Sequence, residues 1–398
     1  MKKNYKLTFA AGIAGIFNQA VVVTLTAVLF VPFVSLYGFK VWQLGVLVAV
    51  SFGFQLLADV VLTFIVDRFP YRPLALTALL LSFAGLTFFA CVPYIFAEKD
   101  IFLGIMTATG IFSLSCGMLE VLISPIIDNM PRPPEKQGAV MSLVHSFYAW
   151  WQVLAVVVTA LLLFWLGFER WNIAVFVWLF VPLVGAALFC FAPLDKKIPD
   201  KKPRSKVWAS GPFAAAALGI AAGGSAEVVM NQYVATFAGL SLGFDQLTSD
   251  IAGMGLFALL LGAGRLLHSR LGGRADLSKV LVVSALAATA LYLAAGLIPV
   301  RAVALAACVL AGAAVSVLWP GTLAVVSARY PSSGVWIFAA LAVCGDFGAA
   351  AAPMFTGFMA ESIGLNYAVA VSSVIPFTAF LCHLYILKAG KPKTTTLI

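Results

Sequence analysis

The sequence predicts an all-α membrane protein: twelve transmembrane helices in two pseudo-symmetric six-helix bundles, with both termini in the cytoplasm. Apolar residues make up 62% of its 398 positions and charged residues only 10%, whereas a soluble protein carries about a quarter charged residues. The apolar residues form long runs, each near the ~20 residues that cross ~30 Å of hydrocarbon as a helix. Helices are expected because backbone groups in lipid must be hydrogen-bonded within their own segment.

Twelve such runs follow one another along the chain. We place them at residues 7–37, 43–66, 73–97, 101–128, 137–167, 171–192, 209–239, 246–269, 278–299, 302–328, 334–360 and 364–387. The first run follows the basic start MKKNYK, which resembles the beginning of a secretory signal. The run continues well past a signal's length and no convincing cleavage site follows, so we assign it to the first span.

The basic residues predict the orientation. With both termini inside, all but four of the 25 Lys and Arg residues fall in cytoplasmic segments; the exceptions are Lys40, Lys99, Arg170 and Arg301. This asymmetry follows the positive-inside rule. The net charge of +9 therefore reflects topology and the anionic inner leaflet, and no nucleic-acid partner is expected. We expect a monomer in a bacterial cell membrane.

The cysteines give no sign of a disulfide framework or a metal site. All six lie within or at the edge of apolar runs, at positions 91, 116, 190, 308, 344 and 382, without paired spacing. We interpret them as small packing residues. No cofactor and no metal are predicted.

One long polar connection divides the chain into residues 1–192, a linker at 193–208 and residues 209–398. The linker, PLDKKIPDKKPRSKVW, is charged and holds three prolines, which is typical of a flexible cytoplasmic segment. The halves correspond weakly: Arg68 and Arg72 recur as Arg270 and Arg274, 202 residues later. Duplicated halves of this kind place a substrate site at their interface, near the bilayer midplane.

Several motifs resemble the major facilitator superfamily, over essentially the whole chain. The loop DRFPYR resembles the superfamily signature of glycine, three residues, Asp-Arg, any residue and Gly-Arg-Arg; Asp67, Arg68 and Arg72 match, while Thr63 and Pro70 replace glycines. Within the superfamily, the chain is most similar to the fucose:proton symporter family and its uncharacterised bacterial relatives. The residues that carry this likeness are GMLEVLISP, HSFYAWWQV, AEVVMNQYVATFA, WPG and GDFGAAAAP.

Four acids lie well inside predicted spans: Asp59, Glu120, Glu227 and Asp346. An acid at such depth costs at least ~2.5 kcal/mol to insert alone, so each is expected to face a cavity or a partner. We treat Glu120, Glu227 and Asp59 as candidates for proton coupling or substrate binding. Asp346 is expected to pair with Arg265, with Asp59 as another possible partner.

Glu120 is the most informative of these acids. It lies eleven residues before Pro131, about 16 Å from the inner face. It belongs to one narrow polar stripe on an apolar helix, made of Ser113, Gly117, Glu120, Ser124 and Asp128. A buried carboxylate can take up and release a proton as a cavity closes and opens. The alternative is a helix–helix hydrogen bond without a functional role.

The resemblance implies that Glu120 takes part in proton-coupled sugar recognition. The resembled symporters also use an acid in the first span, where this sequence has Ala27. Facilitated diffusion, or coupling through a different acid, therefore stays open. The resemblance also implies that the loop residues Asp67, Arg68, Arg72, Arg270 and Arg274 act as gates; the alternative is that they only set topology.

Polar and aromatic residues inside four of the spans are candidates for a substrate cavity. They are Asn18, Gln19, His145, Tyr148, Trp151, Gln152, Asn231, Gln232, Tyr233 and Trp319. Amides bond hydroxyl groups, and indole faces cover apolar ring surfaces, so this set suits a polar ring such as a sugar. The alternative for the tryptophans is anchoring at the lipid interface.

The function predicted from these features is secondary transport by alternating access, for a small polar organic solute such as a sugar. Protons are the possible coupling ion. The sequence has no phosphate-binding Gly-Lys-Ser/Thr loop, which argues against ATP drive, and no grouping of residues typical of an enzyme. The alternatives are a proton-coupled exporter of apolar or drug-like compounds, or a non-transporting membrane sensor of the same fold.

Overall fold

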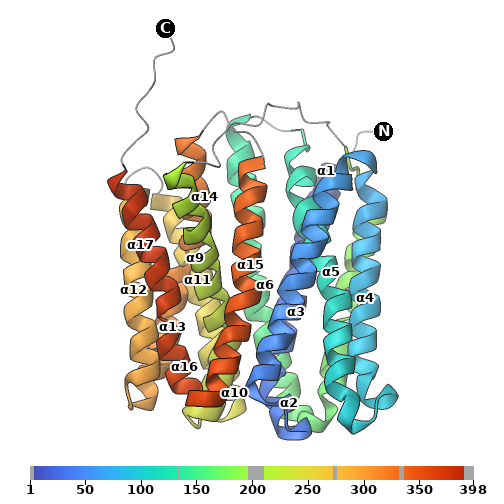
Figure 1. Ribbon diagram of the computed structural model, residues 1–398. Coiled ribbons are helices and arrows are strands. Elements are labelled where there is room, and N and C mark those ends of the chain that lie inside the picture. The colour runs from blue at the N-terminus through green and yellow to red at the C-terminus, as the bar shows by residue number, and fades with distance from the viewer. Residues whose placement is uncertain (1–3, 132–133, 196–209, 272–275, 331–335, 390–398) are drawn as a thin grey trace.

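The computed structural model describes residues 4–131, 134–195, 210–271, 276–330 and 336–389. Throughout these ranges the chain is helical, and it contains twelve segments that are long and apolar enough to cross a membrane. Six of them precede residues 196–209 and six follow. The predicted all-α fold with twelve spans is therefore confirmed. The first residues of α1 and the last residues of α17 lie on the same face of the molecule (Figure 1). We call it the terminal face.

The first six spans are built from eight α-helices. They are α1 (Tyr5–Val28), α2 (Phe30–Tyr37), α3 (Val41–Ile65), α4 (Tyr71–Ile95), α5 (Ile101–Asp128), α6 (Pro134–Leu166), α7 (Trp171–Val177) and α8 (Phe180–Phe191), with short 3-10 turns η1 (Val66–Arg68), η2 (Glu98–Asp100) and η3 (Phe168–Arg170). Gly38 ends the first span in the left-handed conformation, with φ of 64°, which glycine adopts without strain.

The last six spans contain two stretches of π-helix. The elements are α9 (Gly211–Thr236), η5 (Phe237–Ser241), α10 (Gln246–Thr248), η6 (Ser249–Gly255), α11 (Leu256–Leu271), α12 (Leu277–Leu297), α13 (Arg301–Val315), α14 (Leu318–Arg329), α15 (Trp336–Ile363), α16 (Leu365–Val371) and α17 (Val374–Lys388). The π-helices are η5 and η6. Such wide turns are rare and often occur at functional sites.

Helices within each half approach closely at glycines. A Cβ on Gly85 of α4 would lie 2.7 Å from the backbone nitrogen of Phe112 in α5. Gly312 of α13 meets the carbonyl of Phe257 in α11 in the same way. Lipid tails are as apolar as leucine, so membrane helices associate through such close packing rather than through the hydrophobic effect.

The two halves meet along α3 and α15. At the end away from the terminal face, Trp42 stacks on Phe358 with ring centroids 5.7 Å apart. Gly45 allows the backbone of α15 to approach at Pro353, and Tyr233 of α9 donates a hydrogen bond to the Pro353 carbonyl at 3.0 Å. In Figure 1 the spans coloured blue to green and those coloured yellow to red lie largely on opposite sides, with α15 between them.

A second contact between the halves joins α6 to α11 and η6. A Cβ on Gly262 of α11 would lie 2.9 Å from the Ala149 side chain of α6, and one on Gly255 would lie 3.7 Å from Val156. Gln152 lies between Ala149 and Val156 in α6. Residues spaced by three and four share one helix face, so Gln152 lies on the face that meets the other half.

Candidate functional site

Three carboxyl groups gather where the halves meet: Asp59 of α3, Glu120 of α5 and Asp346 of α15. One carboxylate oxygen of each lies within 4.8 Å of one oxygen of the other two. The Glu120 side chain is solvent-exposed, although its carboxylate contacts a cluster that includes Asp346 of the other half. Glu120 therefore faces the space between the halves rather than the lipid.

Two matching polar stripes bring these acids together. Ser51, Gln55 and Asp59 lie four residues apart on α3, and this stripe packs on the predicted stripe of α5. The hydroxyls of Ser51 and Ser113 lie 2.9 Å apart, and Gln55 donates from Nε2 to Oε2 of Glu120 at 2.9 Å. Sequence reasoning missed Gln55, although its spacing four residues before Asp59 is a readable signal.

Among the residues that the structure describes, none is a basic partner of Asp59 or Asp346. Asp346 is 3% exposed and Asp59 is 9% exposed. Oδ1 of Asp59 and Oδ2 of Asp346 are buried without a hydrogen-bond partner, and the two carboxyl groups approach each other to within 4.8 Å. Two acids from opposite halves thus lie together without a neutralising cation.

The predicted pairing of Arg265 with Asp346 is wrong. Nη2 of Arg265 lies 2.7 Å from both carboxylate oxygens of Glu227 in α9, and its Nε donates to the carbonyl of Ser316 at 3.3 Å. The guanidinium thus has its carboxylate partner within its own half, in a charge-assisted geometry. Glu227 was predicted as a coupling acid, and in this structure it is held by that arginine.

Side chains of α6 line the region beside Glu120. The half-buried Tyr148 interacts electrostatically with Glu120, and also with Glu227 and Arg265 of the other half. Trp151 stacks on Phe17 with ring centroids 4.2 Å apart, and its indole nitrogen is buried without a hydrogen-bond partner. Of these two predicted cavity residues, Tyr148 therefore lies toward the acids and Trp151 packs against α1.

Gln152 carries a buried amide, and Asn231 a buried amide oxygen, without a hydrogen-bond partner among the described residues. Gln152 is 0% exposed, and neither its Nε2 nor its Oε1 has a hydrogen-bond partner. Asn231 of α9 is 5% exposed, and its Oδ1 has none either. Trp319 of α14 is half-buried and lies against Gly224 of α9 and Gly345 of α15.

Four other predicted cavity residues make hydrogen bonds inside the protein. Asn18 bonds to Ser115 at 3.2 Å and Ser82 at 2.8 Å, and Gln19 donates to the Cys116 carbonyl at 3.0 Å. Gln232 donates to the Val23 carbonyl of the other half at 3.3 Å. Tyr233 bonds to Pro353, as described above. In this conformation Asn18 and Gln19 stabilise the first half, Gln232 joins the two halves, and Tyr233 ties α9 to α15 within the second half.

The predicted gating residues are described only in part. Arg72 donates from Nη2 to the carbonyl of Ala192 at 2.8 Å, which ties α4 to the end of α8 within the first half. Arg68 is exposed in η1. The side chains of Asp67, His145 and Arg270, and the whole of Arg274, lie outside the described residues.

The structure adds one buried acid that sequence reasoning missed. Asp250 in η6 is 0% exposed and accepts a hydrogen bond from Nε2 of Gln246 at 2.7 Å. It stands near the start of a span, where an acid usually reaches water, and the π-helix that buries it is not visible in the sequence. Only its position within an apolar run could have indicated it.

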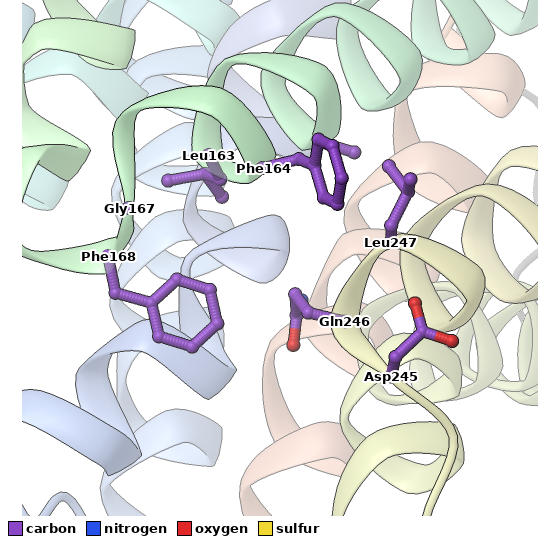
Figure 2. A pocket seen from close by; sticks show the side chains of 8 residues that line it. Leu163, Phe164, Gly167, Phe168, Asp245, Gln246 and Leu247 are labelled. Atoms are coloured by element: carbon purple, nitrogen blue, oxygen red, sulfur yellow. The ribbon is translucent and has the colours of Figure 1, made fainter.

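A pocket of about 300 Å³ lies at the end of the α6 contact away from the terminal face. Figure 2 shows Leu163, Phe164 and Phe168 on one side, with Gln246 and Leu247 on the other. Its lining is mostly apolar, and Leu163 lies eleven residues beyond Gln152, about 16 Å along the helix. This pocket is therefore separate from the carboxyl cluster.

Comparisons with known proteins agree on one family. Residues 7–335 match the Major Facilitator Superfamily, whereas no curated protein sequence matches. A bacterial homolog of the human lysosomal transporter Spinster, in an inward-facing and occupied conformation, aligns with a TM-score of 0.78 at 15% identity, over 98% of each chain. The partially occluded inward-open xylose transporter XylE from E. coli gives 0.77 at 13% identity, over 99% of each chain.

The E. coli fucose:proton symporter FucP aligns with a TM-score of 0.64 at 17% identity, over 96% of this chain and 99% of that one. These proteins share the twelve-span fold and are transporters rather than enzymes. Because the family match covers most of the sequence, the chain belongs to the Major Facilitator Superfamily of membrane transporters.

Proposed function

We propose that this transporter moves a sugar or a related small polar solute by alternating access, with proton coupling through Glu120. The observation that carries the proposal is the set of buried amide atoms without a hydrogen-bond partner, in Gln152 and Asn231, together with an exposed carboxylate, Glu120, between the halves. One residue of the set comes from each half, as a site at the interface requires.

The unbonded amides favour a solute rich in hydroxyl groups. A buried polar group without a partner costs about 1–3 kcal/mol, so these groups are expected to bond something that the structure does not contain. The Gln152 amide offers donors and an acceptor, and Asn231 offers an acceptor; hydroxyl groups can bond both kinds of group. The indoles of Trp151 and Trp319 would cover the apolar faces of such a ring.

The contacts between the halves support access from the terminal face. Trp42 stacks on Phe358, and Lys40 pairs with Glu361, across the two halves at the end away from that face. Glu120 remains exposed to solvent. Two of the aligned structures are named as inward-facing or inward-open, and the predicted orientation makes the terminal face cytoplasmic.

The proposal of proton coupling rests on Glu120 and on the likeness of this chain to FucP. FucP is named as a fucose:proton symporter, and Gln55 holds the Glu120 carboxylate at 2.9 Å in a position that water reaches. A carboxyl group in this setting can exchange a proton as the cavity changes its access. The first span has Ala27 where the resembled symporters have an acid, so Glu120 would act without that partner.

The proposal is tested with purified protein in two steps. Thermal-shift screening against sugars, polyols, nucleosides and organic acids identifies the solute, because a ligand stabilises the state that binds it. Uptake of that solute into proteoliposomes then separates a transporter from a sensor, since a sensor binds without accumulation. Stabilisation by sugars followed by uptake is the expected result; stabilisation only by apolar compounds would contradict it and favour the exporter.

A further inference from the structure

Asp59 and Asp346 form an acid–acid contact within the seam between α3 and α15. We call the end of the protein away from the terminal face the far end. Closer to that end of the same seam, Trp42 stacks on Phe358, and Lys40 pairs with Glu361 at 3.6 Å. Both of those contacts are attractive at any pH near neutrality. The Asp59–Asp346 contact is different, because the two carboxyl groups attract each other when they share a proton and repel each other when both are ionised.

No cation in the described part of the protein neutralises this pair. Two basic groups near the contact between the halves have carboxylate partners of their own: Lys40 pairs with Glu361, and Arg265 pairs with Glu227. The titratable groups that face the pair are acidic or neutral: Glu120 faces both acids, and the Cys116 thiol of α5 also faces Asp59. From α6, Tyr148 reaches Glu120. No described neighbour therefore supplies a positive charge that would favour double ionisation of the pair, and Glu120 adds a further acid to it.

Two ionised carboxylates in contact repel each other, and burial strengthens the repulsion. A single proton forms an O–H bond on one carboxyl, which then donates a short, charge-assisted hydrogen bond to the other. We propose that Asp59 and Asp346 are a proton-dependent latch, which holds α3 against α15 while they share a proton and releases the two helices when both are ionised. Glu120, within 4.8 Å of both and exposed to solvent, gives the proton its route to water.

The latch deepens the proposed function, and it rests on the alternating access that this function assumes. It places proton release at the step where α3 leaves α15 and the far end opens. Asp346 supplies the coupling group of the second half, so that proton binding and the relative position of the halves become one equilibrium. Coupling then involves both halves rather than Glu120 alone.

The test measures the distance between the halves without any solute. Spin labels at Lys99→Cys and Val300→Cys, both exposed at the far end, are placed in a background with the native cysteines replaced. Pulsed electron paramagnetic resonance then reports the ratio of short to long distances from pH 5 to pH 9. If the closed state holds one extra proton, this ratio falls by up to about tenfold for each pH unit.

Asp59→Asn and Asp346→Asn are the decisive variants. An asparagine amide donates to the remaining carboxylate without a proton, so each variant should stay closed across the pH range. Glu361→Gln is the matched control, since it removes a charge from the same seam and should keep the pH response of the parent. The two asparagine variants are measured separately, so that one suffices if the other fails to fold.

Two results would overturn the latch. One is a parent protein whose distances ignore pH, or asparagine variants that keep the parent's response. The other is a closed fraction that follows Na⁺, K⁺, Mg²⁺ or Ca²⁺ at fixed pH, which would make the three carboxyls a cation site. Because the measurement needs no solute, a failed latch leaves the transport proposal standing, and failed uptake leaves the latch result standing.

Discussion

Two groups of acids within the membrane spans of this transporter differ in what surrounds them. Glu227 lies within one half and is neutralised by Arg265, with both carboxylate oxygens 2.7 Å from one nitrogen. Asp59, Glu120 and Asp346 come from both halves, lie within 4.8 Å of one another, and have no basic partner among the described residues. A neutralised acid stabilises a bundle, whereas acids without a cation are available to exchange protons.

The largest effect is expected at Glu120, the acid of the second group that is exposed to solvent. Glu120→Gln keeps the hydrogen-bonding shape and the contact with Gln55 but cannot ionise. Accumulation of solute against its gradient should be lost, while exchange of solute at equal concentrations should continue, because exchange requires no net proton movement. Comparing concentrative uptake with counterflow in proteoliposomes measures both. Accumulation equal to that of the parent protein would remove Glu120 from the coupling step.

Substitutions in the first group, Glu227 and its partner Arg265, should change the stability of the protein instead. Arg265→Gln leaves Glu227 without its cation, and we expect the unfolding free energy to fall by about 2–3 kcal/mol, less than for a fully buried pair. The side chains of Arg265 and Glu227 are 24% and 14% exposed, which moderates the loss. Adding Glu227→Gln should recover much of it. Thermal unfolding of the single and double variants decides this, and a double variant less stable than Arg265→Gln would argue against the pair.

Asn18, inside the first half, is another residue whose substitution should affect stability rather than solute binding. Its amide bonds Ser115 and Ser82, so Asn18→Ala should destabilise the protein by about 2 kcal/mol, at roughly 1 kcal/mol for each lost bond. The KM for the solute should not change, since Asn18 faces α4 and α5. A raised KM with unchanged stability would return Asn18 to the substrate cavity.

Gln152 should behave in the opposite way. Gln152→Met keeps the size of the side chain and removes an amide that has no partner. The protein without solute should be as stable as before or more stable, by up to about 1 kcal/mol. Solute affinity should fall about tenfold, which corresponds to 1.4 kcal/mol. Calorimetric titration and thermal unfolding measure the two quantities, and lost stability with unchanged affinity would make Gln152 a packing residue.

The fold could be predicted from the sequence because the bilayer imposes it. Span length and the distribution of Lys and Arg are set by hydrocarbon thickness and by charge, which act on one segment at a time. The position of the acids was predictable for the same reason. The polar stripe on α5 could also be read, because residues such as Ser113 and Glu120 share a helix face whatever packs against it.

The partners of the acids could not be predicted, because they depend on how helices from different parts of the chain rotate against each other. The sequence alone allowed Arg265 to reach Asp346, but α9 and α11 pack so that Glu227 reaches it instead. Asn18 was a polar residue of the right depth, yet its face of α1 meets α4 and α5. Asp250 was hidden by a π-helix, which has no readable signature in the sequence.

The most direct test of the account measures proton movement that accompanies the solute. Proteoliposomes without a membrane potential are loaded with a pH indicator and given an inward gradient of the solute found by thermal shift. The account predicts an inward proton flux that follows solute entry and disappears in Glu120→Gln, although that variant still equilibrates the solute. Solute entry without any proton flux in the parent protein, at every pH tested, would contradict it.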